Sequence, residues 1–222
     1  MAAGLLSRFR DTIGYQALLL GSFSTLATAL LVSGNALTRE AIAERHREDL
    51  LTSLHEVVPA ALFDNDLLDQ PLKITRADGT QVTVYRGTDH NRVTALAYEA
   101  ETQSGYSGEI RIIMGVNASG EIIGVRVLSH AETPGLGDKI EVAKNDWILQ
   151  FNGLSMGNPS RSGWRVKKDG GNFDAFSGAT ITPRAVLEAI EKGLDFFSEF
   201  KPQLITLTTS TVTPLPQEVS SP

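Results

Sequence analysis

The sequence predicts an α+β protein in which a single N-terminal transmembrane helix precedes a domain with an antiparallel sheet and packing helices. Three observations lead to this fold class. An uncharged apolar run begins at Ile13, strand-like segments with a clear hairpin fill the middle of the chain, and an amphipathic helix follows Thr182. A chain of 222 residues suits one domain of moderate size with additional segments.

Composition excludes several classes of protein. The net charge of -6 gives no basic surface for nucleic acid, so we expect no nucleic-acid partner. The chain has no cysteine, which excludes disulfides, thiolate zinc sites, iron–sulfur clusters and c-type haem attachment. The four histidines stand at no metal-ligand spacing, so we expect no metal site. If the protein carries electrons, an organic cofactor must hold them.

The first element is the apolar run from Ile13 to Val32, which contains no charged residue. About 20 helical residues span about 30 Å, the thickness of a bilayer core. We therefore expect residues 1–12 to be a cytoplasmic tail and residues 13–37 to be a transmembrane anchor. A cleaved signal peptide is the alternative, because small residues surround Ala36. The apolar run is longer than a signal peptide requires, and the arginines on its two sides leave its orientation open.

Residues 38–70 are expected to form a juxtamembrane helix and loop. Thr38 is a candidate N-cap, a loose apolar stripe follows, and Pro59 ends the helix. The string FDNDLLDQP that begins at Phe63 predicts a polar loop with Asx turns.

The folded domain is expected over residues 71–200, and its first half is β. The strings DGTQVTVYRG and RVTALAYEA alternate in hydrophobicity. Two Ile/Val-rich runs then flank NASGE, a loop of hairpin length with a glycine for positive φ.

The loop SHAETPGLGDKI, residues 129–140, follows the second strand of this hairpin. Its glycines either close an ordinary loop or let a ligand approach the backbone. His130 is expected to be structural. Residues 147–176 predict a long surface excursion with one short strand at 164–166, in which Lys167 and Lys168 are solvated or lie near a bound anion.

The string FDAFSGATITPRAV, residues 173–186, leads into the last helix. Thr182 is the predicted N-cap, and Pro183 suits the first helical position. Thr180 then lies just before a helix N-terminus, where unpaired N–H groups and the helix dipole favour a phosphate. A simple capped helix is the alternative. Residues 201–222 are rich in Thr, Ser and Pro and predict a flexible tail, with a strand-like contact with a partner as the alternative.

Two strings resemble known motifs. DAFSGAT, from Asp174 to Thr180, resembles the flavin-attachment motif of the FMN-binding domain family, and HAETPGLG, from His130 to Gly137, is similar to a second motif of that family. Nearly the whole chain, including VVPAALFDNDLLDQ, resembles the G subunits of Rnf-type (Rsx) ion-translocating electron-transport complexes. The C subunit of the sodium-pumping NADH:quinone reductase, from the same family, is the alternative.

The resemblance implies a covalent cofactor and names its site. A flavin transferase joins FMN to the matching threonine by a phosphoester bond, and that threonine is Thr180. Asp174 belongs to the stretch that the transferase reads. The remaining residues expected at the cofactor are Ser177, Gly178, Ala179 and Thr182 around the helix start, with Glu132, Thr133, Gly135, Leu136 and Gly137 in the other loop.

The resemblance also implies the function. It predicts a flavoprotein subunit that relays electrons between ferredoxin and NAD during redox-driven ion translocation, with no independent catalysis. Its partners would be the other membrane subunits, the flavin transferase during maturation and membrane lipid. The domain would face the periplasm from the bacterial inner membrane. A cofactor-free anchored module for periplasmic binding or assembly is the alternative from another class.

Overall fold

The computed structural model describes residues 13–207, except the side chains of residues 34–37, 39–43 and 46. The expectations for residues 1–12 and for most of the tail therefore lie outside the described residues. The chain divides into two units, Met1–Leu50 and Leu51–Pro222, each of which is described by itself.

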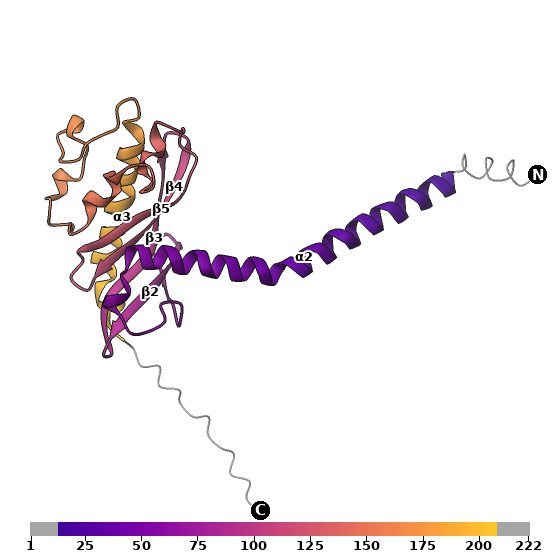
Figure 1. Cartoon of the computed structure of the whole chain (residues 1–222), viewed down its shortest axis with the longest axis horizontal. Coiled ribbons are helices and arrows are strands. Elements are labelled where there is room, and N and C mark those ends of the chain that lie inside the picture. Colours follow the sequence, from indigo (N-terminus) through magenta and orange to yellow (C-terminus); the bar gives the residue numbers. More distant parts are fainter. Residues whose placement is uncertain (1–12, 208–222) are drawn as a thin grey trace, which may run out of the picture. The chain divides into compact units, whose positions relative to one another are not determined.

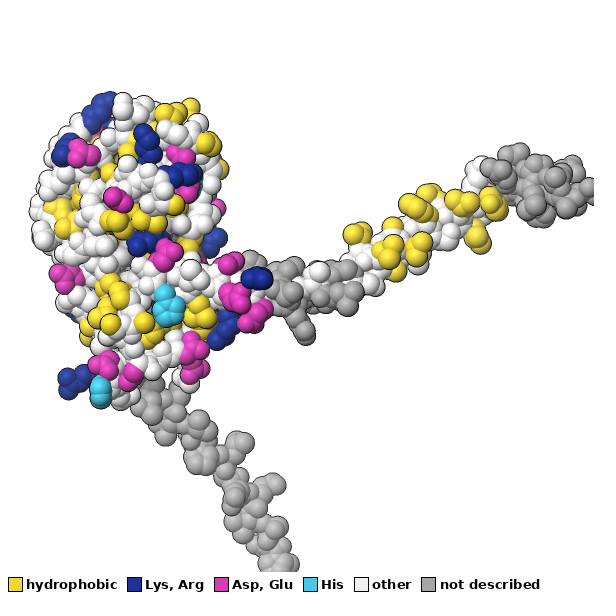
Figure 2. Space-filling view, in the orientation of Figure 1, with side chains coloured by type: hydrophobic (Ala, Val, Ile, Leu, Met, Phe, Trp, Pro, Cys, Tyr) yellow, Lys and Arg dark blue, Asp and Glu magenta, His cyan; other side chains and the backbone are white. Residues whose placement is uncertain are grey.

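Helix α2 (Ile13–Val57) contains the predicted anchor. Among residues 13–207, the stretch Ile13–Ser33 alone is long and apolar enough to cross a membrane. Its large apolar side chains are exposed, Leu18 by 72% and Leu31 by 75%, and they stand out along the helix in Figure 2. The prediction that Thr38 caps a second helix is wrong, because α2 continues through this position without a break.

The second unit contains five antiparallel strands in sequential order (Figure 1). They are β1 (Leu72–Thr75), β2 (Gln81–Asp89), β3 (Arg92–Gly105), β4 (Gly108–Asn117) and β5 (Ile122–His130). The expected β4–β5 hairpin is confirmed. The Asn117 side-chain oxygen accepts hydrogen bonds from three backbone N–H groups of its turn, and Gly120 adopts a φ of 97° there. Strand β1, which is only four residues long, was not predicted.

One face of the sheet is covered by helix α3 (Ile181–Ile205), whose contacts are mostly with β3. The prediction that this helix is amphipathic is confirmed, since the apolar residues that recur at helical spacing are all buried: Val186, Leu187, Ile190, Leu194 and Phe197. The helix also continues past Lys201, where we expected the tail to begin, and Leu204 near its end is fully buried. Apolar packing explains this extension, because Leu204 belongs to the core of the domain.

On the opposite face of the sheet, two glycines allow the end of α2 to approach the strand backbone closely. A Cβ added at Gly115 would lie 2.2 Å from the carbonyl oxygen of Val57, and one added at Gly124 would lie 3.0 Å from Val57 Cα. Leu54 and Val58 are fully buried nearby in the sequence. The last turns of α2 therefore belong to the folded domain.

The segment between β5 and α3 is not a surface excursion, which corrects the prediction for residues 147–176. It consists of short 3-10 helices: η2 (Gly137–Ile140), η3 (Asp146–Phe151), η4 (Arg161–Gly163) and η5 (Lys167–Asp169). Its aromatic side chains form a contiguous cluster, in which the rings of Phe151 and Phe173 are 5.1 Å apart. The expected short strand is only an isolated bridge between Val166 and Phe173. Burial of the aromatic residues draws the segment into the core.

Candidate functional site

The two loops singled out in the sequence meet at one pocket. This pocket has a volume of about 670 Å³ and lies where the β3–β4 turn, the loop after β5 and the N-terminus of α3 converge. Its lining residues are Tyr106, Glu132, Thr133, Leu136, Gly137, Lys168, Gly178, Ala179, Thr180, Ile181 and Thr182.

The loop after β5 is a tight turn that fits closely against the helix start. The carbonyl oxygen of Thr133 accepts hydrogen bonds from the backbone N–H groups of Leu136 and Gly137, each at 3.1 Å. Gly135 supplies the positive φ of 80° that this turn needs. Gly137 has a different role, because a Cβ there would lie 2.7 Å from Thr182 Oγ1. The loop therefore reaches its position only with a bare backbone at 137.

The second loop turns just before α3. Gly178 has a φ of 81°, and the Ala179 N–H group donates to the carbonyl oxygen of Phe176 at 3.1 Å. A Cβ at Gly178 would lie 3.6 Å from Leu136 Cδ2, which is an ordinary van der Waals distance. The two loops are therefore neighbours at this point. Small residues thus leave room for a bulky group beside the helix start.

The helix begins two residues before the predicted position. Thr180 is the N-cap residue of α3, and its side chain makes no capping hydrogen bond. Thr182 is fully buried and donates its hydroxyl hydrogen to Glu132 Oε2, so the prediction that Thr182 is the cap is wrong. A partner 50 residues away in the chain outcompetes the local capping bond. Thr180 is a half-buried residue that lines the pocket, whereas the Thr182 hydroxyl is already bonded to Glu132.

The Glu132 side chain is buried beneath the pocket, with 5% of the residue exposed. Its Oε1 accepts a hydrogen bond from the Ser107 N–H group at 3.0 Å, and its Oε2 accepts from Thr182 Oγ1. Its own backbone N–H group donates to His130 Nδ1 at 3.0 Å. These bonds satisfy a carboxylate whose burial would otherwise be costly.

Charged residues fasten the base of the loop after β5. His130 Nε2 lies 2.8 Å from Glu141 Oε1, and Lys144 Nζ lies 2.9 Å from both Glu141 Oε1 and Asp138 Oδ2. Hydrogen bonding from the Gly135 N–H group, and to a lesser extent from Lys144, holds the pKa of Asp138 below its ordinary value. Hydrogen bonding lowers the pKa of Glu141 in the same way, with Lys144 as the larger contributor and His130 as the smaller. His130 therefore has the structural role that the sequence predicts.

Lys168 brings a positive charge to the pocket, and its two neighbours are held by ion pairs. Lys167 Nζ lies 2.7 Å from Asp174 Oδ2. Arg184 binds both carboxylate oxygens of Asp169, at 2.6 and 2.7 Å. These pairs connect η5 to the loop before α3, through Asp174, and to the first turn of α3, through Arg184, so they fix where Lys168 lies.

Most of the predicted cofactor residues are brought together, but three do not line the pocket. Ser177, Gly135 and Asp174 are exposed outside it, and Asp174 pairs with Lys167. Sequence reasoning missed Tyr106 and Ile181, which are 69% and 42% exposed. For Tyr106 a signal existed, because an aromatic residue stands alone at the tip of the polar turn SGYSG.

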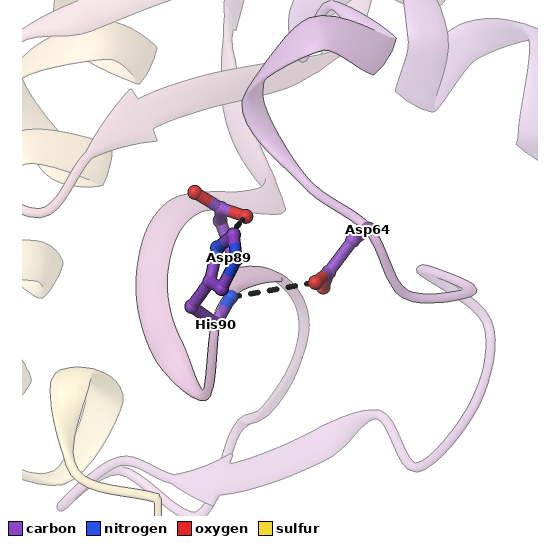
Figure 3. A group of neighbouring side chains, drawn as sticks. All are labelled: Asp64, Asp89 and His90. Atoms are coloured by element: carbon purple, nitrogen blue, oxygen red, sulfur yellow. Dashed lines mark hydrogen bonds and ion pairs between the residues drawn. The ribbon is translucent and has the colours of Figure 1, made fainter.

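A second side-chain cluster joins the β2–β3 turn to Asp64, and none of its members lines the pocket (Figure 3). The His90 ring nitrogen Nδ1 is 2.7 Å from Asp89 Oδ1, and the His90 N–H group donates to Asp64 Oδ2 at 3.4 Å. The His90 side chain is 90% exposed. These contacts close the turn, and we assign no metal to them.

The residues that line the pocket suit a flavin mononucleotide in their chemistry. Tyr106, Leu136 and Ile181 offer exposed apolar surface for a ring system. The start of α3 and Lys168 offer N–H groups and positive charge for a phosphate. A concave site with apolar walls and a few polar groups is typical of cofactor binding.

Comparison with known proteins agrees with this geometry. Residues 105–195 match the FMN-binding domain family. A protein of Cereibacter sphaeroides is 50% identical over 188 residues, covering 85% of each chain, and one of Stutzerimonas stutzeri is 44% identical over 87% of this chain and 84% of its own length. A Pseudomonas aeruginosa protein is 42% identical over 85% of this chain and 90% of its own. Each of the three is named as the G subunit of an ion-translocating oxidoreductase complex. The chain therefore belongs to the family of G subunits of ion-translocating oxidoreductase complexes.

Proposed function

We propose that this chain is a membrane-anchored flavoprotein subunit that relays electrons within an ion-translocating oxidoreductase complex, between ferredoxin and NAD. The names of its relatives and the FMN-binding domain support this role. Their similarity extends over most of the chain, which favours this role over that of the C subunit of the sodium-pumping NADH:quinone reductase. The other membrane subunits of the complex are its expected partners.

We propose further that FMN is attached through its phosphate to Thr180 Oγ1. The observation that carries this proposal is the contrast among the three hydroxyls of the motif. Thr182 donates to Glu132 and is buried, and Ser177 lies outside the pocket. Thr180 lines the pocket at the start of α3 without making a capping bond. Its hydroxyl is therefore the one that is available where a phosphate is favoured.

The residues of the pocket would hold the cofactor rather than react with it. When bound, the flavin accepts and releases electrons one at a time, and the protein sets its position and potential. The N-terminal N–H groups of α3 and Lys168 would bind the phosphate. Leu136, Ile181 and Tyr106 would contact the ring system and keep water from part of its surface.

The anchor accounts for the membrane location of the protein but not for the side on which the domain lies. Residues 13–33 fix the protein to the membrane, and we propose that the domain lies on the periplasmic side of the inner membrane. A covalent tether there prevents loss of the cofactor by diffusion. A flavin transferase is required to form the tether, and the exposed Asp174 is accessible for its recognition.

Visible absorption of the purified full chain, produced together with a flavin transferase, tests the proposal. We expect a yellow protein that keeps its colour in denaturant after gel filtration. A colour lost on denaturation would indicate a bound but untethered ligand. A colourless protein from such cells would refute the flavoprotein role and leave a cofactor-free assembly module.

A further inference from the structure

We propose that the buried Glu132 carboxylate is a positioning residue, which holds the Tyr106 turn and the Thr180 helix start in one geometry around the flavin pocket. The inference rests on the proposed function, because it concerns the surroundings of a flavin tethered at Thr180. In this role the carboxylate acts through the segments that it joins and need not touch the cofactor.

The two oxygens of Glu132 are bound by two different segments. The donor to Oε1 is the Ser107 N–H group, 25 residues away in the sequence, and the donor to Oε2 is Thr182 Oγ1, 50 residues away. The side chain is buried, so loss of either donor would leave an acceptor without water to replace it. The carboxylate thereby connects the β3–β4 turn to the first turn of α3.

Two glycines enclose the carboxylate. A Cβ at Gly105 would lie 2.9 Å from Glu132 Oε1, and one at Gly137 would lie 2.8 Å from Oε2. The backbone of Glu132 is held in addition by its N–H bond to His130 Nδ1. The side chain therefore has little conformational freedom. The two segments that donate hydrogen bonds to it are held in place by a fixed acceptor.

Each bound segment carries a pocket residue close to its attachment point. Ser107 directly follows Tyr106, and Thr182 is two residues after Thr180. The Tyr106 residue is 69% exposed, so packing contributes little to its placement and the Ser107 hydrogen bond contributes more. The carboxylate consequently sets the separation between the aromatic wall of the pocket and the tether.

Tyrosine in contact with an excited flavin quenches its fluorescence, which provides the readout. The experiment uses the full chain with its flavin attached and measures the ratio of flavin fluorescence in the native and denatured states. Glu132→Met keeps a side chain of similar length but replaces both carboxylate oxygens with a single thioether sulfur, which is only a weak acceptor. We expect it to shift the turn about fivefold toward a released position, the effect of losing one typical net hydrogen bond, and so to raise the ratio. Tyr106→Leu should raise it too, and combining the two changes should add little.

Glu132→Gln is the conservative rescue. An amide oxygen can accept from the Ser107 N–H group while the amide NH₂ group donates to the Thr182 hydroxyl oxygen. We therefore expect a wild-type ratio for this variant. Glu109→Met is the matched control, since Glu109 is an exposed carboxylate on the β3–β4 hairpin that also carries Tyr106. If Glu132→Met does not fold, Thr182→Val and its rescue by Thr182→Ser test the Oε2 half of the connection by the same fluorescence ratio.

A Glu132→Met protein with the wild-type ratio, or additive effects of Glu132→Met and Tyr106→Leu, would overturn the inference. An equal effect of Glu132→Gln would also overturn it, because charge rather than hydrogen bonding would then be responsible. Absence of flavin from the wild-type protein would refute the proposed function instead, so the two failures are distinguishable by intact mass.

Discussion

Replacing Gly137 with alanine should destabilise the domain by about 2–4 kcal/mol. The added Cβ would lie 2.7 Å from Thr182 Oγ1 and 2.8 Å from Glu132 Oε2. Overpacking of this kind costs about 1–3 kcal/mol. Relief requires Thr182 and Glu132 to separate, and a buried acceptor that loses its donor costs about 1–3 kcal/mol more. The two costs overlap, because a single movement relieves the clash and breaks the bond.

Two other glycines provide matched controls. Gly135→Ala meets no atom within 4 Å but must adopt a φ of 80°, which should cost about 1–2 kcal/mol. Gly157→Ala also meets no atom within 4 Å and carries no such strain, so its effect should stay within about 0.5 kcal/mol. The expected order of destabilisation is therefore Gly137, then Gly135, then Gly157.

Urea denaturation of the full chain in detergent measures these differences. The only two tryptophans of the chain, Trp147 and Trp164, are buried in the domain and report its unfolding by fluorescence. A thermal midpoint should fall by about 5–15 °C for Gly137→Ala, since 1 kcal/mol shifts a domain of this size by about 2–4 °C. A cost for Gly137→Ala no greater than that for Gly135→Ala would refute the close fit of the loop against the helix start.

Three further predictions concern the anchor, the loop base and the buried hydroxyl. A protein that starts near Leu37 should be soluble, and its recovery as a folded protein in the membrane fraction would contradict a single anchor. Asp138 has a lowered pKa in the fold, so its stabilising effect is fully present above its ordinary pKa of 3.8 and is lost as the pH falls through the lowered value. Lys144→Met should therefore reduce the loss of stability between pH 6 and about pH 3 in urea titrations, and an unchanged pH dependence would contradict it. Thr182→Val should cost about 2 kcal/mol by leaving a Glu132 oxygen without its donor, and Thr182→Ser should recover most of it; equal costs in urea denaturation would contradict the role of this bond.

The parts of the fold that the sequence predicts are those with a strong local pattern. The β4–β5 hairpin has a turn signal between two apolar runs, and its turn is held by the side chain of Asn117. The apolar spacing of α3 identifies its buried face, including Ile190 and Leu194. The short edge strand β1 has only four residues and therefore too little pattern to be recognised.

The errors arise where a distant partner decides the outcome. Thr182 satisfies every local requirement of a cap, yet Glu132, which lies 50 residues earlier, binds its hydroxyl. The residues between β5 and α3 have no helical or strand period, so their burial depends on aromatic contacts such as that of Phe151 with Trp164, 6.1 Å between ring centres. Neither effect is visible in a local stretch of sequence.

The two motifs predict where the candidate site lies, but they do not predict all of the residues that line it. Motif similarity placed Thr180 and Leu136 at the cofactor, and both line the pocket. Tyr106 lies well before the first motif in the sequence and reaches the pocket only through the β3–β4 pairing. Sheet register therefore supplies the part of the site that the motifs leave out.

The most direct test of the central claim is the intact mass of the wild-type and Thr180→Val proteins, each produced together with a flavin transferase. Valine preserves the shape of threonine and removes only the oxygen that a phosphoester requires. The account predicts a wild-type protein that carries the mass of one attached FMN and shows flavin fluorescence in a denaturing gel. It predicts a folded Thr180→Val protein with neither signal, and partial modification of Thr180→Ser. A Thr180→Val protein that still carries the flavin mass would contradict the account and move the attachment to another residue.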